Sequence, residues 1–447
     1  IPISNCINSG YNRIYLLSQF NTASLHRHVQ DAYRFDRFGQ GFVEILSAEQ
    51  TEFGDDWYQG TADAVRRNLI HFGADKDDIF VILSGDQLYR MDFSKMVEEH
   101  LDRGAEITVA AKPVPTDEAT GLGLLRVGES SRIVDFVEKP TDPEVIERLV
   151  PPELKSADGK NDRCLASMGI YVFNASSMLE ALDGDATDFG KEVIPSLVGE
   201  KNVKCHIYDD YWEDIGTVRS FFEANLQLCD NHPQFDFYEQ NHPIYNYPDL
   251  LPMSKFKNSK LIKTNFASGC VVGESNFTRC VLGVRSIIGD TCSFNNVVMM
   301  GADNYEVLSS EGTPVGVGAN SKIENAIIDK NARIGENVIL SGWLHRKRDH
   351  GNLLFIDLRD HYGMTQCVIE NNNNFFPVLE KIKPESVLKI SGKVVKRSDG
   401  TKNLELKTGK IEVMIKSLEI LSNAKELPMP VFGEQEYPED VRLKYRF

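Results

Sequence analysis

Short apolar runs alternate with helical patterns in the first half of the chain. Residues 80–83 (FVIL) form an apolar, β-rich run between helical patterns at 60–69 and 93–101, and a second strand is expected at 105–111. A continuous apolar run of this length is typical of a strand buried in a parallel sheet. The alternation of strands and helices predicts an α/β fold, and we assign 1–232 to one such domain.

Polar residues stand at the ends of several of these strands, where open α/β sheets place their ligands. They are Asp86, after the run at 80–83; Glu138 and Lys139, side by side after 134–137; Ser167, in a Ser-Met-Gly turn expected to open the next strand; and Asp214, between a strand at 203–208 and a helix from Val218. Taken singly, each has an ordinary explanation as a turn, a surface charge or a core contact. Their order along the chain points to a shared site.

These residue types suit metal-assisted nucleotidyl transfer. In this reaction a sugar phosphate attacks the α-phosphate of a nucleoside triphosphate, and pyrophosphate leaves. Asp86 and Asp214 can share one Mg²⁺, a hard cation that binds carboxylate and phosphate oxygens. Lys139 can hold the sugar phosphate, while Glu138 and Ser167 can bind sugar hydroxyls.

From residue 260 the apolar period changes. An apolar residue, often followed by glycine, recurs at 272–273, 282–283, 288–289, 317–318 and 334–335. A six-residue period is typical of a β-helix in which each hexad forms one side of a triangular coil. We assign 259–340 to this β-helix and 233–258, rich in Pro, Asn, Tyr and Phe, to a linker.

Five short β runs follow residue 341, with one helix at 378–382 after the third, and this order predicts an OB-fold β-barrel over 341–424. The runs lie at 341–349, 353–360, 365–369, 387–395 and 411–421. Basic residues beside an aromatic residue on such strands suit the stacking of single-stranded bases with contacts to their phosphates.

Seven motifs in 1–340 carry a specific resemblance. They are 18–28 (SQFNTASLHRH), 57–65 (WYQGTADAV), 85–92 (GDQLYRMD), 136–140 (FVEKP), 166–172 (ASMGIYV), 188–195 (DFGKEVIP) and 211–217 (YWEDIGT). Together they resemble the glucose-1-phosphate adenylyltransferase (ADP-glucose pyrophosphorylase) family of plants and cyanobacteria. The resemblance implies a Rossmann-like mixed sheet of the nucleotidyltransferase class, a left-handed β-helix and a homo- or hetero-tetramer. It also implies Mg²⁺-dependent synthesis of ADP-glucose, a starch and glycogen precursor, from ATP and glucose 1-phosphate.

The same resemblance implies roles for individual residues. Asp86, Lys139 and Asp214 are expected to be catalytic, and Asp86 and Asp214 are also the expected metal ligands. Glucose 1-phosphate is expected to be held by Glu138, Lys139, Ser167 and Gly123, and the adenine side is expected to contain Gln50, Gly60 and Thr61. Anionic regulators are expected to bind to Arg27, His28 and Arg285. For the last three, plain surface charge is the alternative.

Three departures from the family pattern stand out. Leu122 occupies a position where the family often has an aromatic residue, and the β-helix ends before the family's final coils. The chain also begins after the glycine-rich, arginine-containing loop whose backbone N–H groups cradle the ATP phosphates in that family. We therefore expect impaired activity.

The last segment carries a second resemblance. Residues 342–349 (GWLHRKRD), 355–360 (FIDLRD) and 442–447 (RLKYRF) resemble the N-terminal anticodon-binding domain of bacterial-type aspartyl-tRNA synthetase. On that resemblance Phe355 stacks on an anticodon base of tRNA(Asp), while Arg348 and Gln366 contact base edges. The alternative for Phe355 is a place in the barrel core. Residues 425–447 lead toward a class II synthetase domain that is absent, so aminoacylation is not expected.

Composition adds three points. The net charge is −17, yet 342–424 holds 14 Lys and Arg against 10 Asp and Glu, so the two parts suit different partners. There is no apolar run long enough to span a membrane. Eight scattered cysteines without a Cys-x-x-Cys motif fit reduced, buried thiols. We expect a soluble protein of the plastid or the cytoplasm.

Three interpretations stay open: an adenylyltransferase, a tRNA-binding module, and a composite of two partial genes. The change of identity falls inside one expected strand, 338–343, that either family could supply, and this favours the composite.

Overall fold

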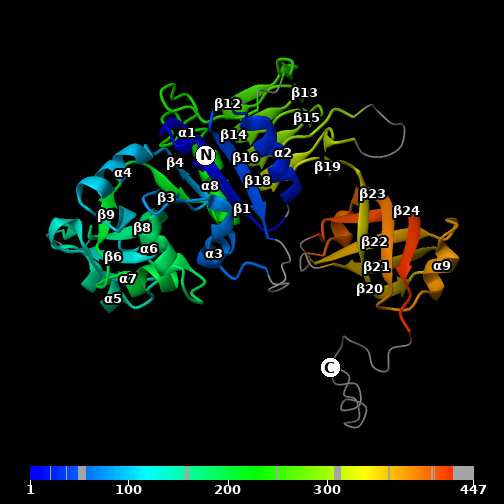
Figure 1. Cartoon of the computed structure of the whole chain (residues 1–447). Coiled ribbons are helices and arrows are strands. Elements are labelled where there is room, and N and C mark those ends of the chain that lie inside the picture. Colours follow the sequence, from blue (N-terminus) through cyan, green and yellow to red (C-terminus); the bar gives the residue numbers. More distant parts are fainter. Residues whose placement is uncertain are drawn as a thin grey trace, which may run out of the picture. The chain divides into compact units, whose positions relative to one another are not determined.

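Two compact units, Ile1–Leu250 and Leu251–Phe447, make up the computed structural model (Figure 1). The structure describes residues 1–20, 22–36, 38–48, 57–156, 161–247, 250–306, 314–360, 363–403, 406 and 408–425. No helix in these ranges is long and apolar enough to cross a membrane. All eight cysteines are buried and free, as the sequence predicts.

Helices and strands alternate along the first unit. The helices are α1 (Pro2–Asn8), α2 (Thr22–Ala32), α3 (Thr61–Phe72), α4 (Phe93–Asp102), α5 (Pro143–Leu149), α6 (Ala175–Ala181), α7 (Ile194–Leu197) and α8 (Val218–Gln227). The strands are β1 (Arg13–Ser18), β2 (Phe42–Ser47), β3 (Ile79–Ile82), β4 (Gln87–Tyr89), β5 (Ile107–Pro115), β6 (Leu124–Val127), β7 (Ile133–Val137), β8 (Arg163–Asn174), β9 (Val203–Ile207) and β10 (Trp212–Asp214).

The main sheet of this unit is mixed. Its strands follow the order β7-β6-β8-β5-β9, and β3 pairs with β8 beside this path. Strands β5 and β9 are parallel, whereas β5 and β8 are antiparallel. Two smaller pairs, parallel β1–β2 and antiparallel β4–β10, complete the strands of the unit. The predicted α/β class with a mixed sheet is confirmed.

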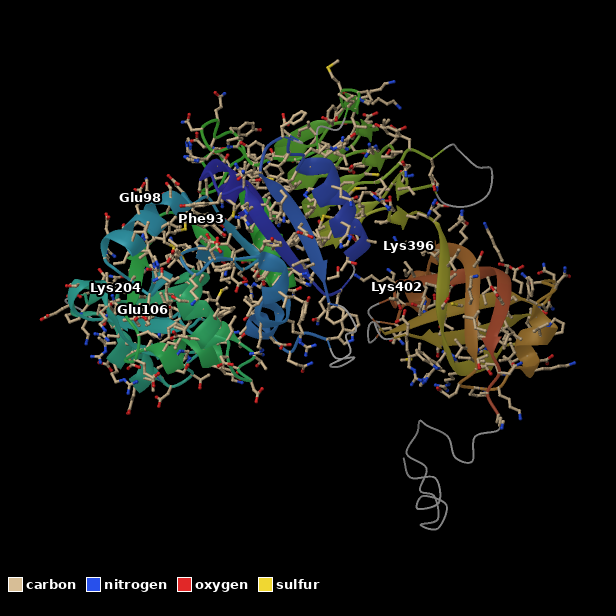
Figure 2. The ribbon with its side chains drawn as sticks, in the orientation of Figure 1. Phe93, Glu98, Glu106, Lys204, Lys396 and Lys402 are labelled. Carbon is tan, nitrogen blue, oxygen red and sulfur yellow. The ribbon has the colours of Figure 1, made fainter. Side chains whose placement is uncertain are left out.

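Alternate residues of β8 face two different cores. Tyr171 and Phe173 belong to one core with Ile107 and Val109, while Ile170 and Val172 belong to the other. Helix α4 covers the second core: Phe93, which begins this helix, is fully buried (Figure 2). The sheet is therefore covered on both faces, as its continuous apolar runs predict.

The expected direction of β3 was wrong. Its four residues are half-buried, and in the described part of the chain it pairs with β8 in the antiparallel sense. An apolar run indicates apolar surroundings on both faces of a strand. It carries no information about the direction of the neighbouring strand.

The Ser-Met-Gly turn was also placed wrongly. Strand β8 begins at Arg163, so Ser167 and Gly169 lie inside it rather than before it. Three residues, 168–170, stand opposite the single residue Ala110 of β5, and Gly169 has a φ of +65°. Glycine adopts this left-handed conformation without steric cost, which allows the bulge.

A β-helix opens the second unit. One face contains β11 (Lys255–Phe256), β13 (Val271–Val272), β15 (Ile287–Ile288), β17 (Gly316–Val317) and β19 (Arg333–Ile334); the longer strands are β12 (Lys260–Phe266), β14 (Asn276–Leu282), β16 (Ser293–Met299) and β18 (Lys322–Ile328). All pairings are parallel. The first coil begins at Lys255, inside the segment 233–258 that the sequence predicts to be a linker.

One corner of the coils is built from left-handed residues. Lys263, Arg279, Asn296 and Asn325 occupy equivalent places in the four longer strands, and their φ angles lie between 46° and 52°. Asparagine tolerates this conformation, while other non-glycine residues lose about 1–2 kcal/mol in it. The two asparagines also form a ladder, since Asn296 Nδ2 donates to Asn325 Oδ1 at 3.0 Å.

Replacing Arg279 by asparagine is expected to stabilise the β-helix by about 1 kcal/mol, because the strained corner would gain a residue suited to it. Amides of β14 and β16 should then exchange their hydrogens about five-fold more slowly. Thr278→Asn, one residue earlier and outside the left-handed set, is the control and should give no such gain. Equal protection in both variants would contradict the assignment of strain to the corner.

A closed barrel follows the β-helix. Its strands, in the order β20-β21-β22-β24-β23, are β20 (Asn337–Asp349), β21 (Leu353–Arg359), β22 (Met364–Glu370), β23 (Val387–Lys396) and β24 (Ile411–Ser422), with α9 (Phe376–Lys381) after β22. Leu344, Ile356, Leu388 and Ile390 form its core with no exposed surface. The predicted five-stranded barrel is confirmed. Strand β20 crosses the expected boundary at 340–341 without interruption.

Candidate functional site

The two candidate metal-binding carboxylates lie on adjacent segments. Asp86 follows β3, and Ser84 Oγ donates to its Oδ1 at 2.7 Å. Strand β10 pairs with β4 so that Asp214 stands opposite Gln87. The backbone N–H of Ile215 then donates to the carbonyl of Asp86 at 3.0 Å. Strand pairing therefore places both acids at one end of this short sheet.

Gly216 shows how close the two carboxylates are. A Cβ atom on this glycine would lie 3.0 Å from Asp214 Oδ1 and 3.2 Å from Asp86 Oδ2. Both oxygens thus line the same small space. Two carboxylates suit Mg²⁺, which usually keeps several waters and binds substrate phosphates as its other ligands. No group of three or more His, Cys, Asp or Glu side chains suited to a metal occurs among the described residues.

The bulge of β8 connects this pair to the candidate sugar-binding residues. A Cβ on Gly169 would lie 3.5 Å from Gln87 Nε2 and 3.6 Å from Ser84 Cβ, so the bulge packs against the segment that carries Asp86. Gln87 is held in turn by Trp212, whose Nε1 donates to its Oε1 at 3.0 Å. Ser167, two residues before Gly169, donates its backbone N–H to the carbonyl of Gly123 at 2.7 Å.

Glu138 lies between two glycine backbones. A Cβ on Gly123 would lie 2.5 Å from Glu138 Oε2, and a Cβ on Gly190 would lie 3.0 Å from the same oxygen. Burial raises the pKa of Glu138; the charge of Lys139 opposes this shift, and that of Asp188 adds to it. The carboxylate is a half-buried hydrogen-bond acceptor beside open backbone, which suits the binding of sugar hydroxyls.

Lys139 has an unusual backbone. Its φ is +46°, and its N–H donates to the carbonyl of Leu122 at 3.2 Å. This conformation costs a lysine about 1–2 kcal/mol, and strained residues of this kind cluster at functional sites. The kink lies directly after Glu138 at the end of β7.

Asp188 belongs to the same cluster, and the sequence motif that contains it gave no role to this residue. Thr61 Oγ1 donates to Asp188 Oδ2 at 3.2 Å and accepts from the N–H of Phe189 at 3.2 Å. Gly60 lies so close to Thr187 that a Cβ would sit 2.3 Å from the Thr187 carbonyl oxygen. Gly60 and Thr61, two of the residues predicted to lie at the adenine side, therefore contact the segment that carries Asp188. The feature of the sequence that could have indicated Asp188 is its place directly before a Phe-Gly pair in the motif 188–195.

Four further predicted residues remain: Gln50, Arg27, His28 and Arg285. Gln50 lies outside the described residues. Arg27 and His28 are exposed on α2, where the His28 ring stands edge-on to Tyr33 at 6.2 Å. Arg285 belongs to the second unit, where its Nη1 donates to the carbonyl of Ala302 at 3.4 Å.

The pH dependence of sugar binding is expected to reflect Glu138. Its pKa is raised, and the charged carboxylate accepts hydrogen bonds from hydroxyl groups more strongly than the protonated acid does. The Kd for glucose 1-phosphate should therefore rise as the pH falls through this pKa, at a higher pH than for an ordinary glutamate. Calorimetric titration over a pH series measures this. Glu138→Gln should bind weakly without that dependence, and an unchanged profile in this variant would exclude Glu138.

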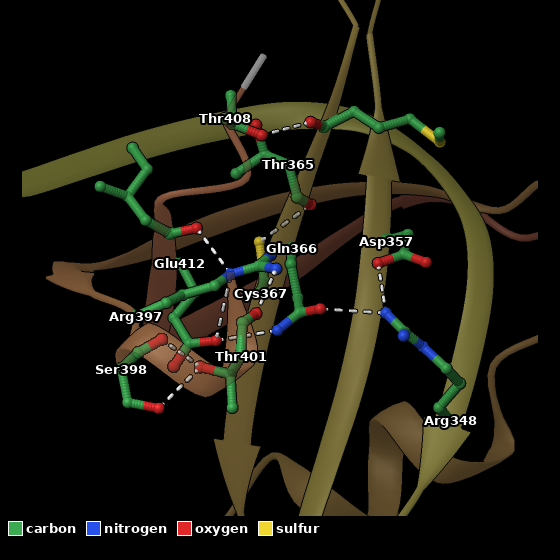
Figure 3. A network of polar contacts seen from close by, with 12 residues as sticks. Arg348, Asp357, Thr365, Gln366, Cys367, Arg397, Ser398, Thr401, Thr408 and Glu412 are labelled. Atoms are coloured by element: carbon green, nitrogen blue, oxygen red, sulfur yellow. Dashed lines mark hydrogen bonds and ion pairs between the residues drawn. The ribbon is translucent and has the colours of Figure 1, made fainter. Parts of the chain in front are cut away.

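A polar network links strands β20, β21, β22 and β24 on the face opposite the barrel core, with Gln366 buried at its centre (Figure 3). Arg348 Nη2 donates to Asp357 Oδ1 at 2.9 Å and to Gln366 Oε1 at 3.0 Å. Gln366 Nε2 donates to Glu412 Oε2 at 2.8 Å. The predicted residues Arg348 and Gln366 are therefore in direct contact, and their acidic partners Asp357 and Glu412 were not predicted.

Phe355 shares this face with Arg348. The two residues stand opposite each other on paired strands, and Phe355 is half-buried, whereas Leu354 and Ile356 on either side of it are buried. The alternation of β21 directs Phe355 outward, so the alternative of a core position is wrong. The His350 ring meets Phe355 edge-on at 5.3 Å. A half-exposed aromatic ring beside a guanidinium suits base stacking.

Three protein-family matches together span these regions of the chain. Residues 1–231 match the family described as Nucleotidyl transferase, residues 249–357 match the GLGC left-handed parallel beta-helix domain, and residues 338–421 match the OB-fold nucleic acid binding domain. The last two matches overlap over most of β20. The first match covers more than half of the chain and contains the Asp86–Asp214 pair together with the Glu138 cluster. The chain belongs to the nucleotidyl transferase family, and its second unit joins a GLGC-type β-helix to an OB-fold barrel.

Proposed function

We propose that the first unit transfers the adenylyl group of ATP to glucose 1-phosphate and releases pyrophosphate and ADP-glucose. One observation carries this proposal. The Gly169 bulge packs against the segment that carries Asp86, while Ser167, two residues away, is bonded to Gly123 beside Glu138. A metal-suited carboxylate pair thus adjoins a cluster suited to a sugar phosphate.

In this mechanism Asp86 and Asp214 would hold Mg²⁺, and the ion would neutralise charge that develops on the triphosphate. The Lys139 ammonium holds the phosphate of the sugar, so that one of its oxygens points at the α-phosphorus. That oxygen forms the new bond as the bond to the β-phosphate breaks, and pyrophosphate leaves. Glu138 and Ser167 orient the sugar ring, and Gly123 allows it to approach the backbone.

The choice of ATP and glucose rests on the motifs 166–172 and 211–217 and on the GLGC type of the β-helix. Pyrophosphate release should be measured for ATP, GTP, UTP and dTTP, each with glucose, galactose and mannose 1-phosphates. ATP with glucose 1-phosphate should be the best pair and should require Mg²⁺. A different best pair would overturn the specificity. Activity that survives Asp86→Ala would overturn the site.

A second function is proposed for the barrel, namely binding of the anticodon loop of tRNA(Asp). Phe355 beside the Arg348–Gln366–Glu412 network favours it, since single-stranded bases are recognised by stacking and by contacts to their edges. Binding should weaken steeply with salt, because phosphate contacts release counterions. Transcripts of tRNA(Asp) with the native and a scrambled anticodon test the proposal, and equal affinity for both would leave only unspecific binding.

A further inference from the structure

Lys112 is a half-buried lysine that the proposed chemistry does not use. It lies on β5, and its Nζ donates to the backbone carbonyl of Asp210, in the loop between β9 and β10. The ammonium also stands over the ring of Tyr208, 5.9 Å from its centre. Both contacts are to the segment that leads into the candidate metal ligand Asp214.

The loop is held at a second point by Tyr208. The single hydroxyl hydrogen of this buried residue is shared between the carbonyls of Arg90, 2.8 Å from the Oη, and Tyr211, 3.2 Å from it. From Trp212 onward, the chain is held by the pairing of β10 with β4. Lys112 and Tyr208 therefore fix the loop just before the strand that presents Asp214.

The loop needs such a contact because it is strongly acidic. Asp209, Asp210, Glu213 and Asp214 all lie within it or directly after it. The Lys112 ammonium is close enough to Asp209, Asp210 and Glu213 to interact with their charges. These carboxylates repel one another, and a nearby positive charge reduces the free-energy cost of placing them together. Lys112 supplies such a charge from strand β5.

We infer that Lys112 is a positioning residue: by tethering the loop at 208–211 it holds Asp214 beside Asp86 and so sets the divalent-cation affinity of the pair. This inference rests on the proposed function of the pair and deepens it. Lys112 does not touch the cation itself. It acts through the loop, in the way that residues behind a metal ligand commonly tune affinity.

Manganese binding to the full chain tests the inference. Mn²⁺ is titrated into the protein while the concentration of free Mn²⁺ is followed by electron paramagnetic resonance. The part of the binding that is lost in Asp214→Asn is assigned to the Asp86–Asp214 pair. Lys112→Met should weaken this component about ten-fold, and Lys112→Arg, which can still donate and stack, should restore most of it. Arg163→Met is the matched control, since it removes a nearby exposed charge without a contact to the loop in any described hydrogen bond.

The outcomes separate three explanations. A purely electrostatic role predicts tighter Mn²⁺ binding in Lys112→Met, because a positive charge is lost, and this result would overturn the inference. A purely structural role predicts lower thermal stability with unchanged Mn²⁺ affinity. This result would also overturn the inference. Equal weakening in Arg163→Met would also count against a tether.

Hydrogen exchange distinguishes failure of the inference from failure of the proposed site. If Asp214→Asn removes no Mn²⁺ component, the metal pair is wrong, but the tether can still be judged. Peptides that cover 208–216 should exchange faster in Lys112→Met than in the wild type or in Arg163→Met. Unchanged exchange in this segment would overturn the inference whatever the Mn²⁺ result.

Discussion

Asp86→Ala is expected to lower pyrophosphate release about 1,000-fold, equivalent to about 4 kcal/mol of transition-state stabilisation. The carboxylate lies at the end of the sheet formed by β4 and β10, where it lines the same space as Asp214. Without it a cation would lose one of the two carboxylates that line this space in the described part of the chain. Initial rates at saturating ATP and glucose 1-phosphate, over a Mg²⁺ series, measure the effect.

Asp102→Asn is the matched control for this experiment. Asp102 is an exposed carboxylate at the end of α4 and has no part in the site. Its replacement should leave the rate unchanged. Asp214→Asn should behave like Asp86→Ala, and the double variant should lose little more than either single one, because the two residues act as a unit. Additive losses would contradict a shared cation.

Phe355→Ala is expected to weaken binding of the tRNA(Asp) anticodon loop about 10- to 100-fold, since loss of one aromatic–base stack costs about 1–3 kcal/mol. The ring is half-buried on the outer face of β21, next to the Arg348–Gln366–Glu412 network. Filter binding or fluorescence anisotropy at fixed salt gives the affinity. The salt dependence should stay the same, because no phosphate contact is removed.

Trp343→Ala provides the comparison within the same barrel. Trp343 is 43% exposed, and the Arg359 guanidinium stands 5.8 Å from the centre of its ring. It is an exposed aromatic residue that is no part of the Arg348 network. Its replacement should have little effect on RNA affinity. Equal losses of RNA affinity in both variants would mean that the RNA binds at another site or contacts the whole barrel surface.

The sequence was sufficient for those parts of the fold that depend on apolar period. A six-residue period predicted the β-helix, and five short runs predicted the barrel, because each pattern admits few alternative architectures. The expected places of three candidate residues relative to strands were also found, since Asp86, Glu138 and Asp214 all follow or end a strand. Strand ends converge in space wherever strands share a sheet.

What the sequence could not predict were pairings between distant segments. The antiparallel direction of β3 depends on β8, which lies far along the chain. The network around Gln366 likewise depends on β24, which brings Glu412 to a residue 46 positions earlier. Local pattern contains no information on such partners. The left-handed backbone of Lys139 was missed for a related reason, because tertiary contacts impose it on a residue that does not favour it.

The bulge in β8 also decides which changes of length the enzyme can tolerate. Two extra residues stand between the pairs Val109–Tyr171 and Ala111–Ser167, an even number, so side chains before and after the bulge keep the same alternation. If one residue were removed there, the side chains on one side of the bulge would all point to the opposite face of the sheet. Either Ser167 or Tyr171 would then be turned away from its present face. Removal of two would preserve the alternation on both sides of the bulge, but it would take Met168, Ile170 or both from the second core. Natural variation in length at this point is therefore expected to occur in steps of two.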